Sequence, residues 1–184
     1  MAKNILVVTG SARKEGNSMS LAYAFIKGAR LSGNAVHRFD CANKKILPVR
    51  DVENSWRKGK PSMNDDDFNA VSPYIQVSDI LVFVTPIYFG GMAASVKLFV
   101  DKLYAYLLPQ RKRDLKFTKA YLIAVCETED MAMFDGLKIT FDRMLHLFGV
   151  DDYELLLVPG VKDIGDINKG TALNDAFELG KSIV

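Results

Sequence analysis

Apolar residues gather in five short runs along the chain, and segments with a helical repeat separate most of these runs. The runs cover residues 5–9, 35–40, 80–85, 120–126 and 155–158. The first, third and fourth runs are almost continuously apolar, as in strands that are covered on both faces. The pattern therefore predicts a sheet buried between helices.

Four segments carry apolar residues near the helical period and are expected to be helices. They cover residues 18–31, 92–103, 133–148 and 171–183. Alternation of strands and helices implies a parallel sheet with helices on both faces. Five strands suit the three-layer, flavodoxin-like α/β fold with strand order 2-1-3-4-5, and we expect residues 1–184 to form a single domain.

Residues 41–67 break this alternation. The segment contains two prolines, many charges and the only tryptophan, Trp56, without a clear period. Loops of this length in compact domains are usually functional or disordered. After it, Ser72-Pro73 resembles an N-cap followed by proline at the first helical position, which predicts a short turn and then a helix over residues 73–77.

The composition and net charge of the chain argue against several classes of function. The formal net charge is only +2, with 49% apolar and 25% charged residues, so no global charge attracts nucleic acid. Asp114 interrupts the basic run 111–113, which favours a solvated loop. The two cysteines and two histidines are isolated, which argues against a disulfide framework or a histidine metal site. No signal pattern or membrane-spanning run is visible, so we expect a cytoplasmic protein without membrane or nucleic-acid partners.

The segment 10–18 joins the first strand to the first helix and is rich in small and polar residues. A loop of this kind directs backbone N–H groups at the N-terminus of a helix, which favours anions. Ser11, Asn17 and Ser18 add donors, and Arg13 adds a cation suited to phosphate. The alternative is an ordinary turn in which Asn17 or Ser18 caps the helix; the combination with Arg13 favours a phosphate site.

Two further loops follow the third and fourth strands, at the edge where ligands bind in open α/β sheets. Residues 85–92 read Thr-Pro-Ile-Tyr-Phe-Gly-Gly-Met. Pro86 ends a strand, Gly90-Gly91 permits a close approach of backbone to a flat ligand, and Tyr88 and Phe89 supply aromatic walls. The opposing interpretation of both aromatic residues is core packing.

These loops resemble motifs of the NAD(P)H-dependent FMN reductase family. Residues 10–18 are similar to its G-S-x-R-x-x-G-N-S motif, and residues 86–101 to its P-x-Y…K-x-x-x-D segment. Gly165-Asp166-Ile167 and the segment 176–181 also fit. The resemblance covers nearly the whole chain and is closest to the iron–sulfur flavoprotein, or multimeric flavodoxin, branch.

The resemblance implies non-covalently bound FMN as cofactor and NAD(P)H as co-substrate. The phosphate would be held by Ser11, Arg13, Gly16, Asn17 and Ser18. The isoalloxazine would be lined by Pro86, Ile87, Tyr88, Phe89 and Gly90. The loop Cys126, Glu127 and Thr128 would approach the other edge of the ring, a match by position only. Hydride would pass from the nicotinamide to flavin N5 and on to a small acceptor such as a quinone, flavin or nitroaromatic. No catalytic acid or base is required of the protein.

The chain departs from the iron–sulfur branch in its long second loop. Val49, Val52, Ser55 and Pro61 stand where that branch carries four cysteines, and none can supply a thiolate. We therefore expect no iron–sulfur cluster. A smaller departure is Lys102, where arginine is common.

Several residues have plain structural interpretations. Lys97 and Asp101 suit a surface i,i+4 pair, Cys41 and Cys126 suit small buried side chains, and His146 suits an exposed position. Asp40 could imitate a ribose-binding carboxylate, but the first loop lacks the dinucleotide fingerprint. Trp56 suits loop or interface packing better than flavin contact, although it and its loop are candidates to cover the flavin.

Two other functions remain open at this point: a flavodoxin-type electron carrier without its own NAD(P)H turnover, and a flavin-binding regulatory module. A sequence pI near 8.4 and Arg13 in the first loop favour the enzyme over the carrier. The resemblance also implies a homodimer or homotetramer. The choice between NADH and NADPH stays open.

Overall fold

Alternate residues of the central strands face opposite sides of one sheet and enter two different cores. In β1 (Asn4–Thr9), Ile5 and Val7 belong to one hydrophobic cluster, and Leu6 and Val8 belong to the other. All four side chains are buried. A strand that is covered on both faces has apolar residues at successive positions, which is why apolar and polar residues do not alternate over residues 5–9.

The computed structural model describes all residues 1–184, and its main strands are parallel in the order β2-β1-β3-β5-β6. The other strands are β2 (Ala35–Asp40), β3 (Ile80–Tyr88), β5 (Lys119–Val125) and β6 (Asp152–Val158). This is the flavodoxin-like order expected from the sequence. A short sixth strand, β4 (Gly91–Met92), was not expected; it pairs antiparallel with the end of β3.

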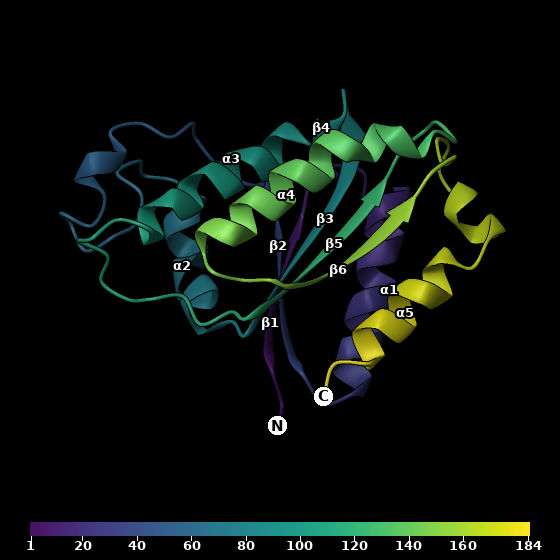
Figure 1. Cartoon of the computed structure of the whole chain (residues 1–184), viewed down its shortest axis with the longest axis horizontal. Helices are drawn as coiled ribbons and strands as arrows, with labels where there is room; N and C mark the ends of the chain where they lie inside the picture. Colours follow the sequence, from purple (N-terminus) through teal and green to yellow (C-terminus); the bar gives the residue numbers. More distant parts are fainter.

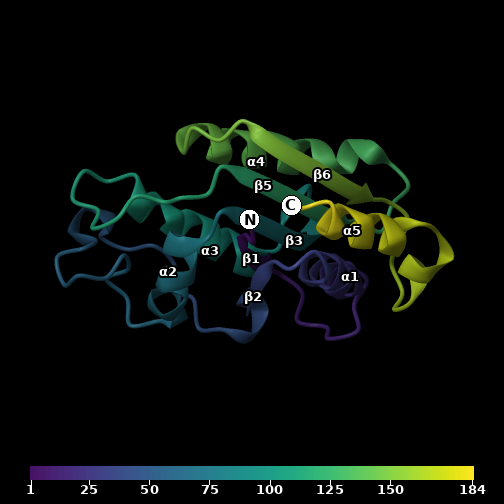
Figure 2. The same cartoon turned by 90° about the horizontal axis from the view of Figure 1, so that it is seen from below.

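Five helices cover the sheet (Figure 1): α1 (Asn17–Leu31), α2 (Asp67–Val77), α3 (Ala94–Lys102), α4 (Asp135–Leu147) and α5 (Ala172–Lys181). Helices α1 and α5 pack on one face, whereas α2, α3 and α4 pack on the other. Figure 2 shows α1 beside α5 as Figure 1 does. The result is the three-layer arrangement that the alternation of elements predicts.

Helix α2 corrects the prediction of a short turn followed by a helix at residues 73–77. The helix begins at Asp67, Asp66 is its N-cap and accepts from Phe68 N–H, and Pro73 lies inside. Ser72 is not a cap: its hydroxyl hydrogen-bonds the Tyr106 hydroxyl at 2.8 Å and accepts from Gln76. A proline inside a helix costs a hydrogen bond, and here the helix continues because Phe68, Val71 and Ile75 pack in the core.

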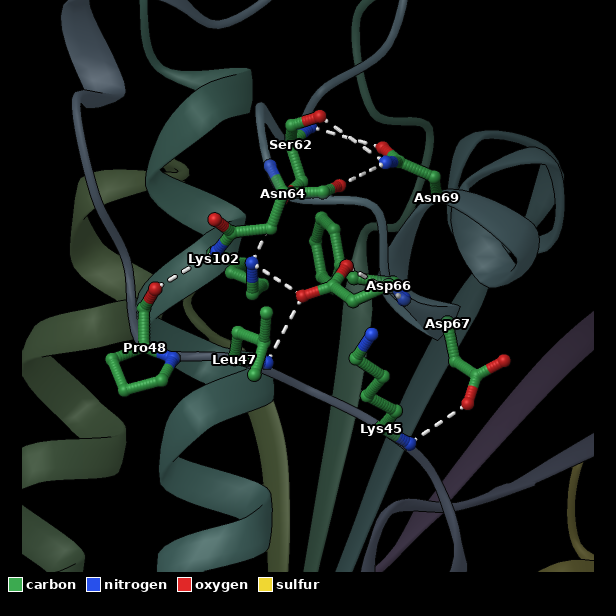
Figure 3. Close-up of polar contacts among 10 residues, drawn as sticks. Lys45, Leu47, Pro48, Ser62, Asn64, Asp66, Asp67, Asn69 and Lys102 are labelled. Carbon is green, nitrogen blue, oxygen red and sulfur yellow. Dashed lines mark hydrogen bonds and ion pairs between the residues drawn. The ribbon is translucent and has the colours of Figure 1, made fainter.

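The long segment 41–66 is a loop that is held against α2 and α3 by polar contacts (Figure 3). Asn69 donates to the carbonyls of Ser62 and Asn64, and the Asn64 side chain donates to the Pro48 carbonyl. Trp56 is 3% exposed, donates its indole N–H to the Ala105 carbonyl and packs against Tyr106. The loop therefore carries its own polar network and an aromatic anchor.

None of the helices combines the length and the apolar composition that a bilayer-spanning segment requires.

Candidate functional site

The carboxyl end of β3 and the loops that follow β1, β5 and β6 surround one cleft of about 260 Å³. Parallel strands bring these ends to the same edge of the sheet, so segments far apart in the chain meet there. The lining residues are Ser11, Arg13, Gly16, Asn17, Ser18, Pro86, Ile87, Tyr88, Val125, Cys126, Glu127, Val161 and Lys162. Ten of these were expected from the sequence, whereas Phe89, Gly90 and Thr128 were expected but do not line the cleft.

The β1–α1 loop places an uncapped helix end at the cleft. The N-cap is Gly16, not Asn17 or Ser18, and no side chain bonds to the cap. The first N–H groups of a helix have no partner within the helix, so those of α1 face the cleft side without a side-chain acceptor. The exposed guanidinium of Arg13 makes no ion pair with any carboxylate, while its backbone N–H donates to Ser11 Oγ at 3.1 Å.

Asn17 lies in the cleft wall, but its amide is already engaged with the loop that follows β6. Its nitrogen donates to the Asp163 carbonyl at 3.0 Å, and its oxygen accepts from Ile167 N–H at 3.4 Å. The residue is 7% exposed. Its side chain therefore joins the β1–α1 loop to the β6–α5 loop across 146 residues of sequence.

The turn between β3 and β4 presents aromatic residues at the rim. Tyr88 is 62% exposed, and Phe89 is fully exposed with a backbone φ of 50°. A positive φ is uncommon for a bulky residue and signals a constrained turn. The tight turn carries Phe89 and Gly90 beyond the lining of the cleft, and their predicted contact with a flat ligand stays a prediction.

Helix α4 approaches this turn closely. A Cβ atom at Gly136 would lie 2.9 Å from the Gly90 carbonyl oxygen, and Gly90 itself has a φ of 73°. Thr85 fixes the other side of the turn, because its hydroxyl donates to the Pro86 carbonyl and accepts from Ala93 N–H. The β3–β4 turn is therefore held from two sides.

The loop after β5 brings a buried thiol and an exposed carboxylate to the cleft. Cys126 is buried, and its Sγ donates to the Thr128 carbonyl at 3.1 Å. The same Thr128 carbonyl also accepts a hydrogen bond from Gly160 N–H, so Thr128 stabilises the loop through its backbone. Glu127 faces the cleft and pairs with Lys162 at 2.6 Å. The pairing raises the pKa of Lys162, so its ammonium is charged at neutral pH.

Sequence reasoning missed Val125, Val161 and Lys162. The two residues after β6 lie in the cleft because Val161 N–H donates to the Cys126 carbonyl, which keeps the β6 loop beside the β5 loop. The available signal was topological: the last strand ends at the same sheet edge as the others, so its following loop was also a candidate.

The other singled-out residues lie away from the cleft. Lys97 and Asp101 form an exposed i,i+4 ion pair, and His146 is exposed, both as expected. Asp40 accepts from Thr9 Oγ1 and pairs with Arg38. Trp56 is part of the core beside α3, so its predicted packing role is confirmed and it does not cover the cleft of its own chain.

The four positions at which the iron–sulfur branch carries cysteines come together in space. Val49, Val52, Ser55 and Pro61 surround a hollow of about 10 Å³ beside Lys102. Their side chains offer no thiolate, and the chain contains no group of three or more His, Cys, Asp or Glu residues arranged to hold a metal ion.

Comparison with known proteins identifies the family of the chain. The sequence profile described as NADPH-dependent FMN reductase matches residues 3–156. The chain is 28% identical over 181 residues, 95% of each chain, to the putative NAD(P)H-dependent FMN-containing oxidoreductase YwqN of Bacillus subtilis. It is 27% identical over 99 residues to an iron-sulfur flavoprotein of Archaeoglobus fulgidus, covering 54% of this chain and 44% of that protein.

Among solved structures, the NAD(P)H:quinone oxidoreductase from Methanothermobacter marburgensis superposes with a TM-score of 0.77 at 15% identity, covering 98% of this chain and 96% of that one. This likeness supports the fold. The profile match over most of the sequence, with which the Bacillus subtilis relative agrees, shows that the chain belongs to the NADPH-dependent FMN reductase family and is an NAD(P)H-dependent flavin oxidoreductase.

Proposed function

We propose that the cleft binds FMN non-covalently, with the phosphate at the β1–α1 loop and the ring between the loops that follow β3 and β5. The observation that carries this proposal is the convergence of the phosphate-type loop, the Pro86–Tyr88 wall and the Cys126–Glu127 loop on one cleft. No single segment of the chain would form such a site.

The phosphate end fits a dianionic ester. The uncapped start of α1 offers backbone N–H donors, Ser11 and Ser18 add hydroxyls, and Arg13 is a cation without a carboxylate partner. Asn17 contributes through the position of its backbone, because its amide is held by Asp163 and Ile167. The ring end fits a flat ligand because apolar and aromatic groups from Pro86, Ile87 and Tyr88 form one side.

When bound, FMN accepts a hydride from NAD(P)H and passes reducing equivalents to a second substrate. The chain binds and orients the cofactor, and the exposed Tyr88 and Phe89 leave the rim beside the β3–β4 turn accessible to a flat second molecule. We propose a small acceptor such as a quinone, flavin or nitroaromatic. The quinone oxidoreductase with the same fold supports this class of acceptor.

We further propose that the protein works without an iron–sulfur cluster, because Val49, Val52, Ser55 and Pro61 cannot bind iron. A homodimer or homotetramer in the cytoplasm is proposed as the working form. Full exposure of Phe89 on a constrained turn beside the cleft supports a neighbouring subunit at this rim. Light scattering of the FMN-loaded protein tests the oligomer, and its absorption spectrum tests the cofactor content.

The decisive experiment mixes the FMN-loaded protein with NADH or NADPH in a stopped-flow instrument. Rapid bleaching of the flavin absorbance, followed by reoxidation on addition of a quinone, is the expected result. Reduction only by a partner protein would instead support an electron carrier, and stable FMN binding without reduction by either would support a regulatory module.

Replacement of Arg13 tests the position of the phosphate. Arg13→Ala is expected to weaken FMN binding by about tenfold or more, because it removes a charge-assisted contact. Riboflavin, which lacks the phosphate, should bind both proteins equally. Lys14→Ala is the matched control, since Lys14 is exposed in the same loop but does not line the cleft. Equal losses for FMN and riboflavin would contradict the placement.

A further inference from the structure

The charged side chains of the cleft are unevenly distributed. Arg13 lies on the β1–α1 loop without a carboxylate partner, whereas Glu127 and Lys162 form an ion pair between the loops that follow β5 and β6. No other lining residue is charged. The β5–β6 side of the cleft therefore holds one positive and one negative charge that balance each other.

Backbone contacts hold the two loops that carry this pair. Gly160 N–H donates to the Thr128 carbonyl and Val161 N–H to the Cys126 carbonyl, both at 2.9 Å. The N–H groups of Lys162 and Asp163 both donate to Asp166 Oδ2. These hydrogen bonds position the backbone at Glu127 and Lys162.

The side chains themselves are open to solvent, with exposed fractions of 61% for Glu127 and 63% for Lys162. An exposed ion pair contributes little to stability. Both members of the pair face the cleft. The pair is therefore better explained by the effect of its charges on a bound molecule than by a contribution to the stability of the fold.

We propose that Glu127 and Lys162 set the reduction potential of the bound cofactor with opposite signs. This inference rests on the proposed FMN site. Reduction adds negative charge to a flavin, and charges near its ring tune its electronics. Lys162 stabilises the reduced form, and Glu127 opposes it by neutralising Lys162. They are positioning and tuning residues, with no proton or hydride passing through them.

The test compares the midpoint potential of bound FMN in the wild type, Lys162→Met, Glu127→Gln and the double variant, by spectroscopic titration against a reference dye. Lys162→Met is expected to lower the potential, so that affinity for reduced FMN falls about two- to fivefold relative to oxidised FMN. Glu127→Gln is expected to raise it by a similar factor. The double variant should return close to the wild type, and Lys162→Arg should retain the wild-type value.

Lys169→Met is the matched control. Lys169 belongs to the same β6–α5 connection and pairs with Asp166, but it does not line the cleft. It should leave the potential unchanged. Circular dichroism and the unfolding midpoint of each FMN-free variant show that the fold is intact.

Shifts in the same direction for Lys162→Met and Glu127→Gln, or no shift in either, would overturn the tuning role. So would a loss of FMN affinity in Lys162→Met without any loss for riboflavin and without a change in potential, because Lys162 would then serve the phosphate. Failure of the wild type to bind FMN at all is a separate outcome: it overturns the proposed function itself, and the tuning role with it.

Discussion

The ammonium nitrogen of Lys102 lies 2.8 Å from Asp66 Oδ2, with side-chain exposures of only 3% and 0%. Figure 3 shows Lys102 reaching from α3 toward Asp66 at the start of α2. Asp66 also accepts from the N–H groups of Leu47 and Phe68, and Lys102 donates to Ser62 Oγ. One buried ion pair therefore joins both ends of the long loop to two helices.

Lys102→Met is expected to lower the free energy of unfolding by about 3–5 kcal/mol, because removal of one partner leaves a buried charge unpaired. Urea denaturation measures the change. Lys97→Met is the control: Lys97 pairs with Asp101 at an exposed site, where the loss should be at most about 1 kcal/mol.

The double variant Lys102→Met/Asp66→Asn should recover part of the loss, because asparagine removes the unpaired charge and can still cap α2. Equal stability of Lys102→Met and Lys97→Met would show that the buried pair contributes no more than the exposed one.

Gly136→Ala tests the contact between α4 and the β3–β4 turn. Alanine is favoured over glycine in a helix by about 1 kcal/mol, yet its Cβ would lie 2.9 Å from the Gly90 carbonyl oxygen. We expect the steric clash to outweigh the helix propensity, so that stability falls. FMN should also bind more weakly, because displacement of the β3–β4 turn shifts the adjoining Pro86–Tyr88 wall. Gly91→Ala is a control on the same turn, because its Cβ would meet nothing nearer than 3.7 Å. A more stable Gly136→Ala protein with unchanged FMN affinity would contradict this account.

Asn17→Ala is expected to destabilise the FMN-free protein by about 1–3 kcal/mol, because the Asp163 carbonyl and the buried Ile167 N–H lose their side-chain partner. Faster hydrogen exchange at Ile167 should accompany the loss. Arg13→Ala, whose guanidinium is exposed, should leave the stability of the FMN-free protein unchanged. Asn17→Asp should rescue only the Ile167 contact, since a carboxylate accepts but does not donate to a carbonyl.

Asp166 makes stability depend on pH at the acid end. Hydrogen bonds from Lys169 and from the N–H groups of Lys162 and Asp163 lower the pKa of this carboxyl to about 2 from a usual value of 3.8. The folded state therefore binds this proton less readily than the unfolded state, so stability is contributed above pH 4 and lost as the pH falls toward 2. Asp166→Asn should reduce stability at pH 7 and flatten its fall between pH 4 and 2. Denaturant titrations at pH 7, 4 and 2.5 measure this, and an unchanged slope in the variant would rule out Asp166 as the source.

The strands could be predicted from local patterns, whereas the strand order followed from the fold class that five alternating strands suit, and most of the cleft wall from the strand-end loops and the family resemblance. The continuous apolar run 80–85 predicts a strand covered on both faces, and β3 lies in the centre of the sheet. Ser11 and Arg13 follow the end of β1, and Pro86 lies near the carboxyl end of β3, which continues to Tyr88 instead of ending at the proline as predicted. The topology of parallel strands brings such positions to one edge.

Features that depend on contacts between distant layers could not be predicted. Lys162 meets Glu127 across 35 residues, and nothing local marks it. The course of α2 through Pro73 is decided by burial of Phe68 and Ile75, which overrides the local signal of Ser72-Pro73. Asn17 is a residue type suited to binding phosphate, but its amide bonds to a loop whose position depends on distant contacts, among them the packing of α5 beside α1 and the hydrogen bonds to the loop after β5.

The burial of Trp56 against Tyr106 gives the molecule an optical reporter of its own. Because this is the chain's only indole, its ultraviolet emission comes from a single known place, the contact between the segment 41–66 and the 3-10 turn Leu103–Tyr106 that follows α3. A red shift on release of that contact, set beside the far-ultraviolet signal of the helices, separates detachment of the loop from collapse of the whole sheet. The segment that interrupts the regular pattern of the sequence is thereby the one whose behaviour can be followed without a label.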